Sequence, residues 1–423
     1  MSSHTLLRHR PTPDLGLRHR TVDAVSSGFR GLPRNLGRPL GWTRGWLRPS
    51  STLAATLFLL VRLANLVLLT LIVRNRHSGR YSGTPLFLDP LRDWDYGWFM
   101  TVAQHGYPST LVPGAQVVDP HAIAFFPGYP GAIWLVSKVL RMQSGYAALL
   151  VSAVAGTVAA VALYQLVRDL YGPRVGLVSV LLWSAQPMGI VLSAGYSEAL
   201  FCAFAFTALR ATQRRQWWAA GVLAFLAGTV RCQGLAVAGT VVACALLAWW
   251  RDGHEPRRLA GTLGPAAFSL AAVPGYILLI GLRVGDLGGW FRMEQDGWHS
   301  GWDGGRTTLR QIWDTAAASP DFFMGVVVVL GVIAVMLYGF ALAERLWFGL
   351  LVYGGLSLIQ LYGSTVMAQS RPRLLVPVVT LVVPLALVIC RARPVSRVLV
   401  LVPLVLFGLW YGAYALSVWQ LGI

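Results

Sequence analysis

Two carboxylates flank a tryptophan in the segment RDWDYGWFMTVAQHGYP. If this segment is helical, Asp93 and Asp95 point roughly 200° away from each other, so we expect only one of them to face a pocket. Asp95 shares its side of the helix with Trp98 and Phe99. A carboxylate against such an aromatic wall is suited to act as a general base. The alternative is that both carboxylates cap the helix N-terminus.

Other charged residues lie at the ends of apolar runs. Glu198, in SAGYSEALF, fits either a functional group at membrane depth or, with Ser197, a helix cap. Arg231, in GTVRCQGLA, lies between two apolar runs, where it would bind an anion or form a buried ion pair. Arg371 and Arg373, in SRPRLLVP, suit a phosphate or pyrophosphate group, unless they merely extend to the membrane interface.

Together these residues suggest a reaction at the water–membrane interface. The arginines would hold a phosphate leaving group, and the carboxylate would deprotonate an acceptor hydroxyl. The sequence contains no P-loop, no GxSxG and no HExxH motif, so soluble nucleotide chemistry is not indicated. The histidines show no metal-site spacing, and we expect neither a metal nor a cofactor.

The composition identifies the elements that must position these groups. Only 12% of the 423 residues are charged and 55% are hydrophobic, whereas soluble domains are about a quarter charged. We therefore predict an all-α polytopic integral membrane protein. The net charge of +18 could indicate nucleic-acid binding. The arginines, however, lie in the N-terminal tail and in short loops, as the positive-inside rule predicts for cytoplasmic segments. We expect no nucleic-acid partner.

The apolar runs predict about eleven transmembrane helices. Residues 1–50 are expected to be a disordered basic cytoplasmic tail and residues 51–423 a transmembrane domain. The alternation of basic loops holds only if 126–140 does not cross, so we expect that segment to be an interfacial or re-entrant helix on the outer side. Two Trp-rich outer loops remain, about 75–145 and 285–320. The expected spans are about 52–74, 146–168, 175–192, 196–211, 217–232, 234–250, 262–283, 321–343, 346–364, 372–391 and 396–416.

The segment RDWDYGWFMTVAQHGYP, followed by HAIAFFPGYP, resembles the first outer loop of the second GPI mannosyltransferase (PIG-V-like) family. This family belongs to the GT-C glycosyltransferases and includes many bacterial proteins, and we expect a bacterial member here. The blocks SAQPMGIVLSAGYSEALF, LAGTVRCQGLA and SRPRLLVPVV agree in the same order. The resemblance covers roughly residues 52–391, and its first two blocks are the more specific ones.

The resemblance implies an inverting reaction without a bound metal. The donor would be a polyprenyl-phosphate sugar, commonly mannose, and the acceptor a hydroxyl of a glycolipid or glycan among the membrane lipids. Asp95 would be the catalytic base and Asp93 its weaker substitute. The donor phosphate would be bound by Arg231, Arg371 and Arg373. The substrate pocket would be shaped by Trp94, His121, Phe126, Tyr129, Tyr196 and Glu198.

Our leading hypothesis is therefore a GT-C glycosyltransferase in the plasma membrane, and the resemblance implies that it is a mannosyltransferase. It would be multi-pass, with a cytoplasmic N-terminus and an active site on the outer face. A membrane transporter or flippase of lipid-linked substrates is the alternative, although no clear internal repeat of the transporter type is visible. A non-catalytic membrane scaffold that keeps the fold is a third reading.

Overall fold

The computed structural model describes residues 49–75, 88–112, 114, 117–253, 256–318 and 322–419. Almost all of the predicted disordered tail, residues 1–50, lies outside these described residues, as does the part of the first outer loop at 76–87. Within them the chain forms α-helices and short 3-10 helices, and the described residues pair no strands beyond one bridge between Trp302 and Ser364. The all-α prediction is confirmed for this part of the chain.

The longest helices follow the apolar runs of the sequence. Five have the length and hydropathy to cross a membrane, or seven if each of two bent helix pairs is one span. The chain is thus a multi-pass membrane protein. The five are α3 (Pro49–Arg74), α7 (Ser144–Tyr171), α11 (Gly234–Arg251), α16 (Phe322–Ala343) and α20 (Pro394–Ser417).

The remaining predicted spans are also helical, but they are shorter or bent. One bent pair is α12 (Pro256–Ser269) with α13 (Ala272–Val284), and the other joins α18 (Arg371–Leu374) to α19 (Val382–Arg391) through a sharp break. Because short helices can cross only with help from their neighbours, the number of about eleven spans stays a prediction. The shorter apolar helices are α8 (Pro173–Ser184), α10 (Trp217–Val230) and α17 (Phe348–Tyr362), and α9 (Glu198–Gln213) is a further short helix at a predicted span.

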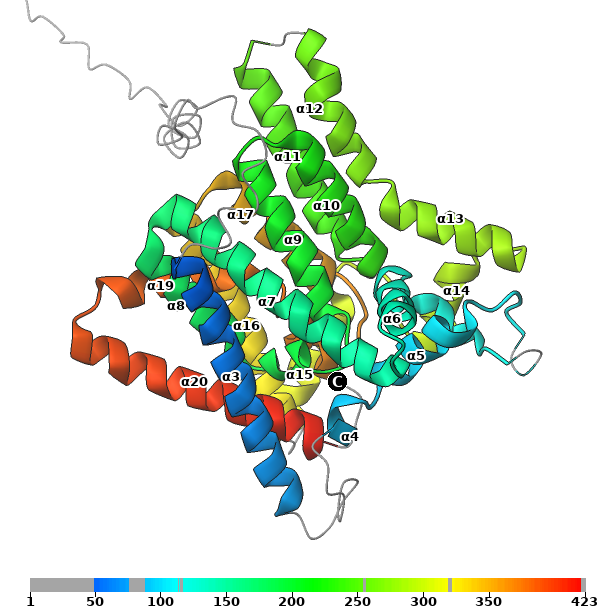
Figure 1. Cartoon of the computed structure of the whole chain (residues 1–423), viewed down its shortest axis with the longest axis horizontal. Coiled ribbons are helices and arrows are strands. Elements are labelled where there is room, and N and C mark those ends of the chain that lie inside the picture. Colours follow the sequence, from blue (N-terminus) through cyan, green and yellow to red (C-terminus); the bar gives the residue numbers. More distant parts are fainter. Residues whose placement is uncertain are drawn as a thin grey trace, which may run out of the picture.

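Helix α7 lies at the centre of the bundle and packs against α3, α8 and α9 (Figure 1). Small residues on α7 allow this close approach, as is typical of helix contacts inside membranes. A Cβ atom at Gly156 would lie only 2.6 Å from the Phe58 ring of α3. Glycine at this position therefore sets the spacing between α3 and α7.

A buried arginine connects α3 to the segment that leads into α9. The Arg62 guanidinium donates hydrogen bonds to the carbonyl oxygens of Ser184, at the end of α8, and Gly189, at the start of the 3-10 helix η2 (Gly189–Leu192). Carbonyls at helix ends lack intrahelical partners, and a cation inside a membrane protein needs such acceptors. This contact fixes the chain just before α9, which carries part of the candidate site.

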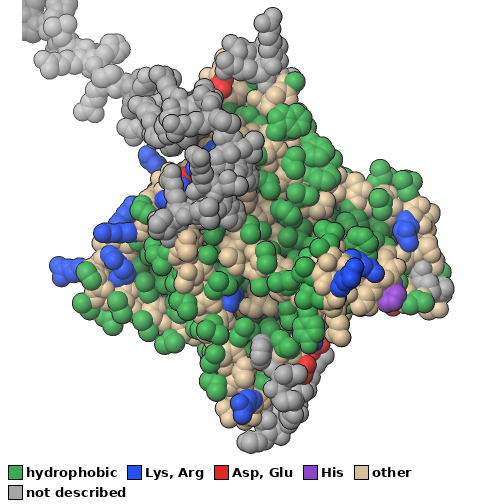
Figure 2. All heavy atoms as spheres, in the orientation of Figure 1, with side chains coloured by type: hydrophobic (Ala, Val, Ile, Leu, Met, Phe, Trp, Pro, Cys, Tyr) green, Lys and Arg blue, Asp and Glu red, His purple; other side chains and the backbone are tan. Residues whose placement is uncertain are grey.

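The two loops predicted to be outer, which keep that name below, form helices in their described parts and touch each other. The first forms α4 (Leu88–Leu91), α5 (Asp95–His105), the 3-10 helix η1 (Pro120–Ala124) and α6 (Gly128–Val139), and the second forms α14 (Gly289–Trp298) and α15 (Arg306–Ala318). Helix α14 packs on η1. The 12 residues of α6 rise about 18 Å, too short for about 30 Å of hydrocarbon, in agreement with a segment that does not cross. Apolar side chains cover much of the face seen in Figure 2.

Candidate functional site

The chain changes direction at Trp94, the tryptophan between the two carboxylates of the first outer loop. Helix α5 begins at Asp95, and Trp94 before it has a φ of 58°, in the left-handed region that large residues rarely adopt. Asp93 therefore precedes the helix, and the helical spacing that separates the two carboxylates does not apply to it. Both Asp93 and Asp95 line the same cavity, contrary to the expectation that only one would face a pocket.

The helix-cap interpretation of these carboxylates is not supported by the hydrogen bonds. The N-cap position of α5 is Trp94, and no side chain caps it. Asp93 accepts a hydrogen bond of 2.9 Å from the backbone N–H of Trp94, and the Asp95 carboxylate is paired with an arginine far along the chain. Asp95 is thus held by tertiary contacts rather than by its own helix.

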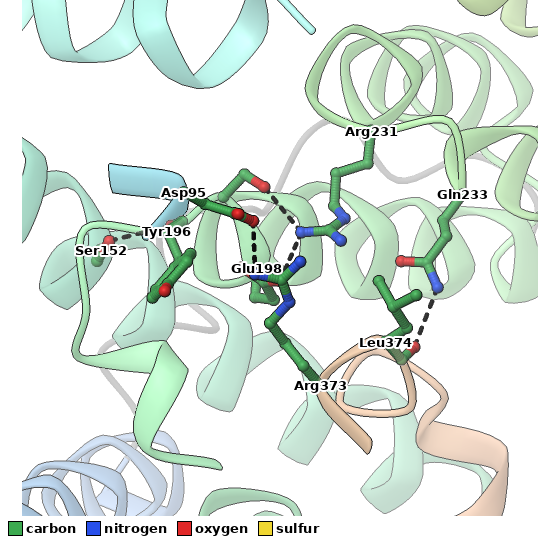
Figure 3. Close-up of polar contacts among 9 residues, drawn as sticks. Asp95, Ser152, Tyr196, Glu198, Arg231, Gln233, Arg373 and Leu374 are labelled. Carbon is green, nitrogen blue, oxygen red and sulfur yellow. Dashed lines mark hydrogen bonds and ion pairs between the residues drawn. The ribbon is translucent and has the colours of Figure 1, made fainter. Parts of the chain in front are cut away.

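Four charged side chains alternate in sign along one line (Figure 3). Arg373 donates to Asp95 at 2.5 Å and lies 3.3 Å from Glu198. Arg231 donates to the same Glu198 oxygen at 2.6 Å and to the Ser197 hydroxyl at 2.8 Å. Glu198 is fully buried, so its charge requires both arginines, whereas the Asp95 side chain is 22% exposed and remains accessible.

The local sequence explains why these groups converge. Glu198 is the first residue of α9, and Arg231 ends α10. Ser197 precedes α9 but makes no cap hydrogen bond with its side chain, so the capping alternative for SAGYSEALF is replaced by an ion pair. Pro372 in the first turn of the short helix α18 starts the turn that carries Arg373 into the site.

Tyr196 packs against the charged residues of this line. Its fully buried ring lies 5.3 Å beneath the Arg373 guanidinium, and its hydroxyl donates to the Asp93 carbonyl oxygen at 3.2 Å. A Cβ at the preceding Gly195 would lie 2.4 Å from the Tyr96 ring of α5, so only glycine permits this approach. The α5 and α9 segments are thereby fixed against each other.

The charged line opens into a cavity of about 830 Å³ between the two outer loops and the ends of α10, α17 and α18. This volume is in the range that holds small-molecule ligands. Aromatic rings form part of its walls, and polar and charged side chains, including Glu294, form another part. The aromatic lining residues are Trp94, Trp98, Phe99, Phe125, Phe126, Trp290, Phe291, Trp298 and Trp302.

The structure brings together six of the eleven residues predicted from the sequence. Those that line the cavity are Asp93, Trp94, Asp95, Phe126, Arg231 and Arg373. Tyr196 and Glu198 lie directly behind them and reach the cavity through Arg231 and Arg373.

The other three lie elsewhere. The Tyr129 hydroxyl is fully buried and hydrogen-bonds to Ser152 at 2.9 Å, joining α6 to α7. His121 pairs with Asp119 at 2.5 Å and lies behind the aromatic wall, with its ring 6.0 Å from that of Trp98. Arg371 is buried and does not line the cavity. Their predicted roles at the substrate remain predictions.

Residues of the second outer loop were not singled out by the sequence analysis. Trp290, Glu294 and Trp298 recur every four residues along α14 and all line the cavity. This i, i+4, i+8 spacing places them on one helix face and could have revealed them. Burial raises the pKa of Glu294 to about 7, although a hydrogen bond with Ser300 acts in the opposite direction. Glu294 is thus a carboxyl group of the cavity lining that titrates near neutral pH.

The raised pKa of Glu294 predicts a pH-dependent stability. In the unfolded chain the pKa of this carboxyl group is near 4.5, so the folded state binds the proton more tightly. The free energy of unfolding therefore falls as the pH rises from 4.5 through 7. We expect Glu294→Gln to have little effect on the unfolding temperature at pH 5 and to raise it relative to wild type at pH 8. Thermal unfolding in detergent measures this, with the exposed Asp296→Asn on the same helix as control. A difference that does not change with pH would contradict the prediction.

Among the described residues, no three His, Cys, Asp or Glu side chains gather in a way that could hold a metal ion. The expectation of a reaction without metal or cofactor is untested by this observation. The groups that could act chemically in the described cavity are the two carboxylates at one end, Glu294, and the two arginines.

Residues 82–270 match the family model described as Mannosyltransferase (PIG-V). GPI alpha-1,6-mannosyltransferase 2 of Mus musculus is 37% identical over 162 residues, which cover 36% of this chain and 31% of that protein. The Homo sapiens protein of the same name is 34% identical over 162 residues, which again cover 36% of this chain and 31% of that protein. GPI mannosyltransferase 2 of Yarrowia lipolytica is 30% identical over 178 residues, 41% of this chain and 46% of that protein. The chain thus spans about a third to a half of the length of these relatives.

Solved structures of the oligosaccharyltransferase of Archaeoglobus fulgidus are also similar. The complex of AglB with an inhibitory peptide and a dolichol-phosphate is 15% identical, with a TM-score of 0.46 over 86% of this chain and 55% of that chain. The complex with Zn and sulfate is 15% identical, with a TM-score of 0.48 over 85% and 52%. The matched family segment includes Asp95, Glu198 and Arg231 but ends before Arg373.

Proposed function

Because residues 82–270 are PIG-V-like, we propose that this protein is a glycosyltransferase that moves mannose from a polyprenyl-phosphate carrier to an acceptor hydroxyl. The observation that carries the proposal is that Asp95, Arg373 and Arg231 line one cavity together with aromatic side chains. A base and two phosphate-binding cations at a membrane-protein cavity fit a lipid-linked donor better than a soluble one.

In the proposed reaction, Asp95 accepts the proton of the acceptor hydroxyl. The hydroxyl oxygen then attacks the anomeric carbon from the face opposite the phosphate, which inverts the configuration there. The bond between the sugar and the phosphate breaks, and its electron pair leaves with the phosphate. The guanidiniums of Arg373 and Arg231 hold this phosphate, because bidentate donors match its oxygens and stabilise developing charge. The aromatic walls supply faces for the sugar rings.

The proposed setting is the plasma membrane, with residues 51–423 as one GT-C-type transmembrane domain. The basic residues of the first fifty positions favour a cytoplasmic N-terminus by the positive-inside rule. With that orientation, both Trp-rich loops and the cavity between them face the outer side. The acceptor would then be a glycolipid or glycan at the outer surface.

A transfer assay tests the function. The purified protein would be placed in nanodiscs with radiolabelled polyprenyl-phosphate-mannose and a total lipid extract. Label moving into a new species supports the proposal and identifies the acceptor. Donor that neither binds nor reacts would overturn the mannose assignment, and counterflow of a labelled solute in proteoliposomes would instead favour the transporter alternative.

The two nearby arginines should differ in donor binding. Arg373 lines the cavity and Arg371 does not, so we expect Arg373→Lys to weaken donor binding about tenfold while Arg371→Lys leaves it nearly unchanged. Lysine keeps the charge but loses the bidentate geometry, so the difference reports phosphate recognition rather than net charge. Equilibrium binding of the labelled donor to nanodiscs measures both. Equal losses in the two variants would contradict the assignment of Arg373.

A further inference from the structure

A second cavity, of about 620 Å³, lies on the other side of the first outer loop. It is bounded by α5, the C-terminal part of α6 and the first residues of α7. Arg92 and Tyr96 line it, whereas Asp93, Trp94 and Asp95, between them in the sequence, line the cavity of the candidate site. The RDWDY segment therefore separates two cavities, and only one of them is used in the proposed reaction.

The second cavity is built to attract an anion. The Nε and Nη2 atoms of Arg92 are buried and have no hydrogen-bond partner among the described residues, while the guanidinium is held 4.5 Å above the Tyr146 ring. Lys138, at the end of α6, adds a second cation. No acidic side chain is among the residues that line the cavity.

The start of α7 contributes a third positive element. Gln143 is its N-cap and makes no cap hydrogen bond with its side chain, and the first turn contains no acidic residue. Ser144 and Gly145 lie at the cavity wall. The first two residues of this 28-residue helix therefore lie beside the same space as the two cations, and the N-terminus of a helix favours phosphate.

Apolar side chains border the cavity. Trp134 lines it and is half exposed, and Leu135 and Val139 of α6, with Leu140 just after that helix, are more than half exposed. Figure 2 shows basic side chains gathered over α5 and α6 beside apolar surface. A free phosphate would leave this apolar surface uncovered, whereas a lipid would cover it with its hydrocarbon chains.

We propose that this cavity binds the phosphate headgroup of an anionic membrane lipid. The phosphate lies between Arg92, Lys138 and the start of α7, and the hydrocarbon chains lie along Trp134 and Leu135. Because Tyr96 lines the cavity and also packs against Gly195, the bound lipid contacts α5 at the residue next to Asp95.

Lipid-dependent thermal stability of the full chain tests this proposal. Protein in a neutral detergent would be titrated with phosphatidylglycerol, phosphatidylcholine or inorganic phosphate, and the unfolding temperature recorded. We expect phosphatidylglycerol to raise the unfolding temperature of the wild type, and phosphatidylcholine and inorganic phosphate not to raise it. Arg92→Gln should raise the half-saturating concentration about tenfold, as expected when a charge-assisted hydrogen bond is lost.

Matched variants make the test specific. Lys138→Gln removes the exposed second cation and should also weaken the effect, which covers the case in which Arg92→Gln folds poorly. Arg141→Gln removes a positive charge three residues after Lys138, at a residue that does not line the cavity. It should leave the stabilisation by phosphatidylglycerol unchanged. Equal stabilisation by phosphatidylcholine, an undiminished response in both Arg92→Gln and Lys138→Gln, or stabilisation by inorganic phosphate alone would overturn the proposal.

Discussion

Asp95→Asn should reduce the proposed mannose transfer by about a hundredfold to ten-thousandfold, the range that a general base contributes. Asparagine keeps the size of the side chain and can still accept a hydrogen bond from Arg373, which lies 2.5 Å from the carboxylate. It cannot take the proton of the acceptor hydroxyl. Initial rates with labelled donor in nanodiscs measure the loss, and the donor affinity should change by much less than the rate.

Asp93→Asn is the matched control, because Asp93 lines the same cavity two positions away. Its carboxylate accepts from the Trp94 N–H, and asparagine can accept the same bond. We expect the rate of this variant to stay within about tenfold of wild type, on the scale of a neutral hydrogen bond. An Asp95→Asn protein with near-normal transfer would remove Asp95 as the base, and a greater loss in Asp93→Asn would assign the role to Asp93.

Glu198→Ala should destabilise the fold by about 3–5 kcal/mol, the cost of leaving buried charge without its partner. Glu198 is fully buried and is the carboxylate between Arg231 and Arg373. Its loss leaves Arg231 without a carboxylate among its described contacts and forces Arg373 to rely on Asp95 alone. The free energy of unfolding in mixed micelles measures the change, and we expect Glu198→Gln to be less severe because it retains a hydrogen-bond acceptor.

A second glutamate–arginine pair provides the comparison. Glu344 accepts hydrogen bonds of 3.0 and 3.1 Å from Arg391, whose side chain is 62% exposed. Exposed pairs of this kind contribute about 0–1 kcal/mol, so Glu344→Ala should have a small effect. If Glu198→Ala were as mild as Glu344→Ala, the charged line at the site would not be holding α9, α10 and α18 together.

Sequence reasoning worked best where a single physical requirement dominates. Apolar length determines where membrane helices form, and each predicted span coincides with helical structure in the described part of the chain. The number of crossings does not follow in the same way, because α9 and α10 are short and their crossing depends on packing. Arg231 and Glu198 were found because charge within apolar sequence is costly and therefore rarely accidental.

The features of the site that residue types did not reveal have a tertiary origin. Arg371 and Arg373 are equivalent in the sequence, but the turn of α18 carries only Arg373 to the cavity. The role of Tyr129 at the substrate remains a prediction, but the hydrogen bond by which its hydroxyl joins α6 to α7 is not apparent from residue types. Asp93 was assigned to a helix that begins only at Asp95, because the positive φ of Trp94 is not apparent from residue types. Glu294 belongs to the site because α14 packs on η1, a contact between two segments far apart in the sequence.

The alternating line of Asp95, Arg373, Glu198 and Arg231 is electrically neutral as a whole when all four are ionised. In the proposed reaction the phosphate of the donor carries one negative charge as a diester and two as the released monoester. The second charge arises in the same step in which Asp95 takes up a proton and becomes neutral. At that moment the line acquires a net positive charge, carried by Arg373 as its partner is neutralised. The second negative charge on the leaving phosphate is thus balanced by the line as soon as it forms, without movement of any side chain.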